Sequence, residues 1–105
     1  MDDDKKWRGQ NAAEIVTQDF LQELDRANVL EDVLFERLRQ DELWGDQSGH
    51  ANERWLVILI EEVGEVARAM YDDDEGHTYE EIIQCAAVCM AWAEAMQKRK
   101  NNGKQ

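Results

Sequence analysis

The length and charge of this chain limit what it can be. It has 105 residues, of which 24 are acidic and 12 are basic, so its formal net charge at pH 7 is -12. A chain of this length forms one domain with a modest core. Its negative charge argues against a nucleic-acid polymer as partner, because such binding needs a basic surface, but a single nucleotide could be held through a metal ion.

The sequence predicts an all-α fold. Proline is absent and no run alternates as a strand would, so only glycine and polar clusters interrupt the helical patterns. We expect a disordered N-terminus over residues 1–10, a single helical domain over 11–100 and a short tail over 101–105. No apolar run approaches the roughly 18 residues of a membrane helix, and the acidity suits a soluble protein, so we expect a cytoplasmic protein without membrane contact.

Two helical segments are predicted in the first part of the chain, at 12–26 and 28–41. Apolar residues recur at three- and four-residue spacing in both, which gives each segment one apolar stripe. They form either one long helix or two helices that are broken near Asn28.

A turn-rich connection is predicted at 43–52, where two glycines accompany short polar residues. Trp44 either covers the core or offers a surface on which a nucleobase can stack. Asp46 and Gln47 either form turns and caps or contact the polar edge of a substrate.

The third helix, at 53–71, carries Glu61, Glu62 and Glu65 inside the most apolar run of the sequence. At helical spacing these three carboxylates fan over an arc of about 100°. If the arc is partly buried, each ion costs several kcal/mol unless a counter-charge arrives. A divalent cation such as Mg²⁺ or Mn²⁺ would supply it. The alternative is an ordinary solvated acidic face.

Two arginines and one glycine flank or interrupt the acidic arc of this helix. Arg54 and Arg68 either neutralise the arc through neighbours on the helix or contact a phosphate group. Gly64 costs the helix up to about 1 kcal/mol relative to alanine. One reason for a glycine there would be close approach of another helix or a ligand.

A solvated acidic turn is predicted at 72–77, followed by a fourth helix at 78–99. The turn does not have the ligand spacing of an EF-hand calcium loop. Thr78 and Glu81 have the spacing of a capping box, with Thr78 as the N-cap. Glu81 is therefore either a capping residue or a metal ligand, and Gln84, on the same face, is a neutral ligand, a substrate contact or an ordinary helix residue.

The fourth helix is apolar on nearly all sides, which favours self-association because such a helix must be covered on most sides. Cys85 and Cys89 lie four residues apart on one helix face, where disulfide geometry is poor. We expect both to be reduced thiols.

Two motifs in this order resemble the MazG-type all-α nucleoside triphosphate pyrophosphohydrolases, and in particular short phage-type MazG-like proteins. The first is Glu61-Glu62-Val63-Gly64-Glu65. The second is Glu81-Ile82-Ile83-Gln84, in which Gln84 stands where the family usually has aspartate. Trp44-Gly45-Asp46-Gln47 and the apolar run at 55–60 also match, so the resemblance covers about residues 43–96. It implies a four-helix bundle-type fold that is completed by dimerisation or tetramerisation.

The resemblance also implies hydrolysis of an NTP or dNTP to the nucleoside monophosphate and pyrophosphate. Glu62, Glu65 and Glu81 would bind Mg²⁺, or Mn²⁺ in its place, with Gln84 at the edge of the site. Glu61 would be the catalytic residue that orients a ligand or the attacking water. The implied contacts to the base or phosphates are Trp44, Asp46, Gln47, Arg54 and Arg68.

Two other interpretations stay open at this level. The chain could be a non-catalytic helical protein that uses its acidic surface to bind a basic partner, an interpretation favoured by Gln84 and by a capping role for Glu81. Phosphoribosyl-ATP hydrolysis shares the same chemistry, but no separate feature of the sequence supports it.

Overall fold

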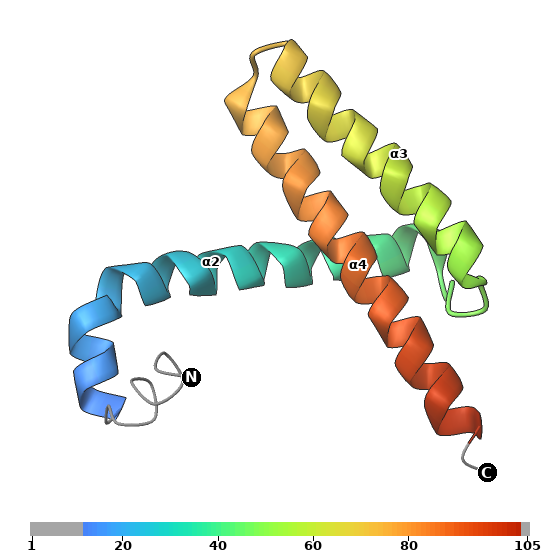
Figure 1. The fold of residues 1–105 in the computed structure, drawn as a ribbon, viewed down its shortest axis with the longest axis horizontal. Coiled ribbons are helices and arrows are strands. Elements are labelled where there is room, and N and C mark those ends of the chain that lie inside the picture. The colour runs from blue at the N-terminus through green and yellow to red at the C-terminus, as the bar shows by residue number, and fades with distance from the viewer. Residues whose placement is uncertain (1–11, 104–105) are drawn as a thin grey trace, which may run out of the picture. The chain divides into compact units, whose positions relative to one another are not determined.

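The computed structural model describes residues 12–103, and the side chains from residue 22 onward, and shows three helices and no strand there (Figure 1). They are α2 (Ala12–Trp44), α3 (Asn52–Tyr71) and α4 (Glu75–Gly103). The prediction of an all-α fold is confirmed. The two segments predicted at the start are one helix, and the expected N-terminus at 1–10 lies outside the described residues.

The chain divides into two compact units, Met1–Leu30 and Glu31–Gln105, and α2 contributes to both. In the first unit, the Arg26 guanidinium pairs with the Glu23 carboxylate one turn earlier on α2. All the features described below lie in the second unit. Within residues 12–103 no helix is both long and apolar enough to cross a membrane.

Helices α3 and α4 run antiparallel and side by side, joined by a three-residue turn (Figure 1). Asp73 lies in this turn with a φ of 56°, the left-handed region that aspartate tolerates better than most residues. The backbone amide of Asp74 donates to the carbonyl of Ala69 at 3.1 Å. The tight turn brings the C-terminal end of α3 beside the N-terminal end of α4.

Asp74, and not Thr78, caps α4. Its carboxylate accepts a hydrogen bond from the backbone amide of His77 at 3.0 Å, which is a typical N-cap contact. The Thr78 hydroxyl donates back to the Asp74 carbonyl at 2.7 Å. The predicted capping box of Thr78 and Glu81 is therefore wrong: α4 begins three residues earlier, and Glu81 lies in its second turn.

Small side chains on α4 allow two apolar clusters to form around it. Ala87 is fully buried beside Val33 of α2 and Ile83 of α4. Trp55 of α3 packs in the second cluster, which includes Ala95 of α4. Helix α4 thus packs against both α3 and the last part of α2, and brings three helices together in this unit.

The connection after α2 is held against α4 by polar contacts. Gly45 has a φ of +70°, a conformation that suits glycine. The Asp46 carboxylate accepts from Lys98 Nζ at 3.1 Å. Asn52 Oδ1 accepts from Trp92 Nε1 at 2.9 Å and from an Arg99 guanidinium nitrogen at 2.7 Å. These contacts fix where the connection passes over the helices.

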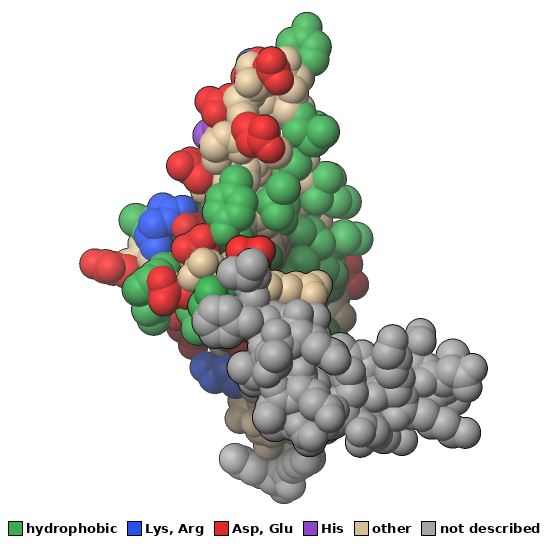
Figure 2. All heavy atoms as spheres, turned by 90° about the vertical axis from the view of Figure 1, so that its left-hand side faces the viewer, with side chains coloured by type: hydrophobic (Ala, Val, Ile, Leu, Met, Phe, Trp, Pro, Cys, Tyr) green, Lys and Arg blue, Asp and Glu red, His purple; other side chains and the backbone are tan. Residues whose placement is uncertain are grey.

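A large apolar surface is left uncovered on the helix hairpin. Figure 2 shows hydrophobic side chains gathered along one edge of the hairpin near its turn, with acidic side chains along the other edge. The exposed large hydrophobic residues of α3 are Leu56, Val57, Ile60, Val63, Met70 and Tyr71. Gly64 lies within this stretch, and a Cβ placed there would meet no atom within 4 Å, so nothing in the described chain approaches it closely.

Candidate functional site

One carboxylate from each of the three helices lies in or near the interior of the second unit. They are Glu36 of α2, Glu62 of α3 and Glu81 of α4, which we call the acidic cluster. The Glu81 residue is only 7% exposed, the Glu36 side chain is 12% exposed and Glu62 is half-buried. Carboxylates with so little exposure destabilise the folded protein unless their oxygens find hydrogen-bond partners or counter-charges.

Burial raises the pKa of Glu62, and the negative charges of Glu81, Glu65 and Glu36 raise it further. The effects of Glu81 and Glu36 come from two other helices, so the packing of the fold creates them. Glu62 therefore lies close enough to both Glu36 and Glu81 for their charges to act on it. A cation at this place would remove that repulsion.

The three carboxylates differ in how many of their oxygens have a hydrogen-bond or ion-pair partner. Both oxygens of Glu36 are bound, at 2.8 and 2.7 Å, by the guanidinium of Arg39, and Gln40 Nε2 lies 3.4 Å from one of them. Glu81 Oε1 lies 3.3 Å from Nε2 of His77. In contrast, Oε2 of Glu62 and Oε2 of Glu81 are buried and have no hydrogen-bond partner in the described part of the chain.

The donor chemistry of the acidic cluster fits a hard divalent cation, because free carboxylate oxygens are the ligands that Mg²⁺ and Mn²⁺ prefer. The geometry is less complete: among the described residues, no three acidic, histidine or cysteine side chains converge as a metal-ligand set. The two unpartnered oxygens therefore supply the chemistry for a cation, and any further ligand would require a change of side-chain position or a water molecule.

The other residues predicted for the metal site lie at its edge. Glu61 and Glu65 are exposed on α3. Gln84 is half-buried on α4, one turn after Glu81. Burial raises the pKa of the Cys85 thiol, and the charges of Glu62 and Glu81 raise it further. The side chain of Cys85 therefore also lies near the acidic cluster. Of the predicted set, the structure brings Glu62 and Glu81 together most clearly.

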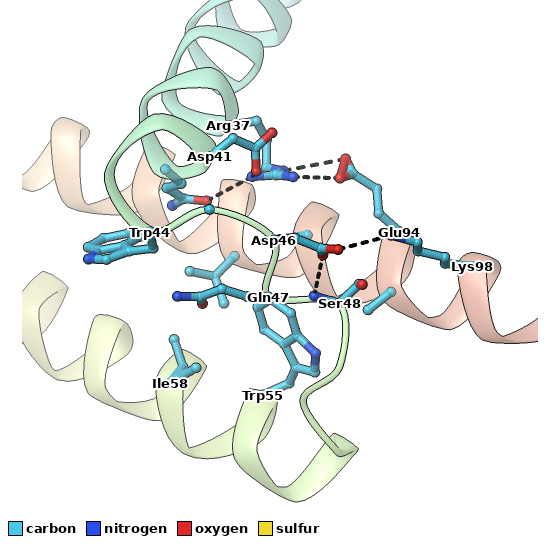
Figure 3. Close-up of a pocket in the computed structure, with 15 residues that line it drawn as sticks. Arg37, Asp41, Trp44, Asp46, Gln47, Ser48, Trp55, Ile58, Glu94 and Lys98 are labelled. Atoms are coloured by element: carbon cyan, nitrogen blue, oxygen red, sulfur yellow. Dashed lines mark hydrogen bonds and ion pairs between the residues drawn. The ribbon is translucent and has the colours of Figure 1, made fainter.

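Three of the predicted substrate residues, Trp44, Asp46 and Gln47, line one cavity of about 400 Å³ (Figure 3). Trp44 is exposed at the end of α2, and Gln47 is half-buried. Trp55 and Ile58 of α3 form another part of the wall. The cavity therefore offers aromatic surface together with amide groups.

Three ion pairs lie on the polar side of this cavity, and Figure 3 shows the side chains that form them. Arg37 contacts Asp41 on its own helix at 3.0 Å. Arg37 of α2 contacts Glu94 of α4 at 2.6 Å. Asp46 accepts from the backbone amide of Ser48 at 2.9 Å as well as from Lys98. Hydrogen bonds from Ser48 and the charge of Lys98 hold the pKa of Asp46 well below its usual range. Asp46 thus holds the connection in place as an ionised group.

The cavity and the acidic cluster follow one another along the same helices. Gln40, Ile58 and Val88 line the cavity, each from a different helix. Glu36 lies four residues from Gln40, and Glu62 lies four residues from Ile58, which on a helix means the same side and about 6 Å along the axis. Glu81 lies seven residues from Val88, about two turns along the same side of α4. A ligand with one flat end and one charged end could therefore reach both places.

Arg54 and Arg68 lie outside this arrangement. Arg54 is exposed in the first turn of α3. Arg68 lies in the last turn, where Nε is 3.8 Å from a carboxylate oxygen of Asp72 and the side chain is largely exposed. The described structure places neither of them on the wall of the cavity.

Sequence reasoning missed Glu36, Arg39 and Gln40. A glutamate and an arginine three residues apart on a helix are typical of a surface ion pair, so nothing local distinguishes them. Only the packing of α2 against the other two helices brings Glu36 near Glu62. Comparisons with protein-family models, with curated proteins and with solved structures found no match for this chain.

Proposed function

We propose that this protein is a Mg²⁺-dependent nucleoside triphosphate pyrophosphohydrolase of the MazG-like type, which cleaves an NTP or dNTP to the monophosphate and pyrophosphate. The observation that carries the proposal is the pair of buried, unpartnered oxygens, Oε2 of Glu62 and Oε2 of Glu81, on adjacent helices. A buried acceptor without a hydrogen-bond partner costs about 1–3 kcal/mol of folding free energy. A bound ligand that contacts both oxygens would remove this cost for Glu62 and Glu81 together.

In this proposal Glu62 and Glu81 bind the cation directly, while Glu65 completes the site from the exposed side and Gln84 lies at its edge. A bound Mg²⁺ ion would offset the charge of the triphosphate and lower the pKa of an attacking water. Glu61 is the acid we assign to orienting that water. It is exposed one residue before Glu62, so it can reach solvent beside the cation site.

The cavity supports a nucleotide as the substrate. Trp44 offers an exposed ring on which a base can stack, and Gln47 offers both a donor and an acceptor to the base edge. Glu36 and Glu62 lie about one helical turn from the cavity residues on their helices, and Glu81 lies about two turns away, on the side where the phosphates would extend.

Release of pyrophosphate from the common NTPs and dNTPs, with Mg²⁺ and with a chelator, tests this proposal. We expect metal-dependent turnover of at least one nucleotide. Glu62→Gln and Glu81→Gln should abolish it, whereas Glu53→Gln, an exposed acid in the first turn of α3, should keep the wild-type rate. Folded protein that turns over none of the nucleotides would refute the proposed activity.

A homodimer or homotetramer is part of the proposal, because the exposed apolar residues of α3 need a cover in water. A reducing compartment such as the cytoplasm suits the two free thiols, Cys85 and Cys89. Sedimentation analysis tests the oligomer directly, and a monomer at micromolar concentration would refute it.

A non-catalytic acidic interaction protein is the second candidate. Two observations favour it: Gln84 is neutral, and no metal-ligand set of three side chains converges among the described residues. The two candidates differ in their response to Mg²⁺. A cation at 100 times its dissociation constant stabilises a folded protein by about 2.7 kcal/mol, and the interaction protein should show no such gain.

A further inference from the structure

A second hollow, a groove of about 840 Å³, lies between the last part of α2 and the beginning of α4. Glu36 and Arg39 form part of its α2 wall, and Tyr79, Glu80 and Gln84 form part of its α4 wall. Glu36 belongs to the acidic cluster and Gln84 to the edge of the proposed cation site, so the groove shares these two residues with that region.

Arg39 has unused hydrogen-bonding capacity in this groove. Its Nε and one terminal nitrogen bind the two oxygens of Glu36 at 2.8 and 2.7 Å, and its side chain is 50% exposed. A guanidinium carries five N–H donors, so three remain after this fork. The second terminal nitrogen makes no hydrogen bond or ion pair that involves the described residues. Glu36 therefore orients the guanidinium without exhausting it.

The charge of the groove selects among possible ligands. Asp32, Glu36, Glu75 and Glu80 are the acids on its wall and Arg39 is the one base, so the formal charge is 1 - 4 = -3. A bare anion would be repelled, whereas a polyphosphate that brings its own divalent cation would be repelled far less. Gln84 on the same wall is a neutral amide that adds no negative charge and can donate a hydrogen bond to a phosphate oxygen.

We propose that Arg39 binds the diphosphate end of a cation-bound polyphosphate in this groove, with Glu36 holding the guanidinium in position. The planar fork of arginine matches phosphate oxygens in a way that lysine does not. Arg54 and Arg68, the two arginines expected to contact phosphate, lie at the two ends of α3 and off the walls of this groove. This proposal rests on the proposed function and adds a phosphate-binding residue to it.

The same position makes Arg39 a competitor of the metal. The charges of Glu36 and Glu62 both stabilise its guanidinium, so the arginine already neutralises part of the acidic cluster. Removing the arginine should therefore weaken binding of the anion and strengthen binding of a bare cation. A merely structural ion pair would not move the two affinities in opposite directions.

Calorimetric titrations of the full chain with Mn²⁺ alone and with inorganic pyrophosphate in saturating Mg²⁺ test this. For Arg39→Gln we expect about tenfold weaker binding of Mg²⁺–pyrophosphate and tighter binding of Mn²⁺. Arg39→Lys keeps the positive charge but loses the bidentate geometry of the guanidinium. Its affinity for Mg²⁺–pyrophosphate should lie between those of wild type and Arg39→Gln. Arg26→Gln is the matched control, because Arg26 pairs with Glu23 at the same spacing on α2 and should leave both affinities unchanged.

Two results would overturn the assignment: wild-type protein that does not bind Mg²⁺–pyrophosphate, and arginine variants that bind it as well as wild type does. If Arg39→Gln fails to fold, judged by circular dichroism, Arg39→Lys decides alone, and wild-type affinity in that variant counts against the assignment. A protein that turns over no nucleotide but binds pyrophosphate through Arg39 would refute the proposed activity and leave this assignment standing.

Discussion

Replacing Glu62 by glutamine should make the protein more stable while removing its response to Mg²⁺. Glu62 is half-buried, with one buried oxygen that has no partner in the described structure and with Glu36 and Glu81 close by. An unpartnered buried acceptor costs about 1–3 kcal/mol. Solvent screens part of the repulsion at a half-buried group, so we take the lower end, about 1 kcal/mol.

This free energy corresponds to a rise in melting temperature of about 4 to 8 °C for a domain of this size. The glutamine amide should increase this stability further, because its N–H groups can donate a hydrogen bond to the unpartnered Oε2 of Glu81. The carboxylate of Glu62 can only repel that oxygen. Glu61→Gln is the matched control. It removes the same charge one residue away at an exposed position, and we expect a change within about 0.5 kcal/mol.

The gain should depend on pH, since the folded protein raises the pKa of Glu62 above its ordinary value of 4.5. A carboxyl group with a raised pKa favours the folded state when it is protonated. The contribution of Glu62 to the free energy of unfolding is fully present below its ordinary pKa, and it is lost as pH rises through the pKa of Glu62 in the folded protein. The variant should therefore exceed wild type most at about pH 8, and the difference should vanish below about pH 4.5.

Thermal unfolding followed by circular dichroism, with a chelator and then with Mg²⁺, measures both effects. Wild type should gain about 2.7 kcal/mol in Mg²⁺ at 100 times the dissociation constant, and Glu62→Gln should gain almost nothing. A variant that melts below wild type in chelator at neutral pH would refute the argument that Glu62 is held at a cost. Equal Mg²⁺ responses would show that Glu62 is not a ligand.

Three further outcomes test other parts of the structure. Asp74→Ala should cost about 1 kcal/mol in urea unfolding through loss of the α4 cap, whereas a larger cost for Thr78→Ala would restore Thr78 as the capping residue. Thiol titration should modify the exposed Cys89 faster than Cys85, whose raised pKa keeps it protonated, and single-serine variants identify each phase. Gly45→Ala should cost about 1–2 kcal/mol through its left-handed φ alone, because the added methyl group meets no neighbour; unchanged stability would contradict this.

The all-α class, the start of α2 and both bounds of α3 could be predicted from the sequence because they depend on local patterns. Absence of proline and helical spacing of apolar residues predicted the helices, and α3 begins within one residue of its expected start. The continuity of α2 through Asn28 could not be decided, since asparagine is a poor but tolerated helix residue. The start of α4 was misplaced because Asp74 and Thr78 are both good N-caps.

Some residues of the candidate site could likewise be predicted from local patterns, and others could not. Glu62 and Glu65 stand out in the sequence because acidic residues in an apolar run break a local rule, and in the structure Glu62 is half-buried with a raised pKa. Glu36 and Arg39 obey the local rules, so no pattern identifies them. Their position beside Glu62 depends on the packing of α2 against α3 and α4, which sequence spacing does not contain.

Glu81 shows most clearly how the structure changes the argument. The sequence allowed it two roles that exclude each other, because a carboxylate that caps its own helix has little capacity left for a cation. Asp74 takes the capping role, so Glu81 is free of it. It is nevertheless 93% buried (100 - 7), with one oxygen unpartnered and a half-buried glutamate on the neighbouring helix. His77 contacts only Oε1 of Glu81, so the ion pair on α4 leaves Oε2 unaccounted for, and the proposed cation would give that oxygen a partner.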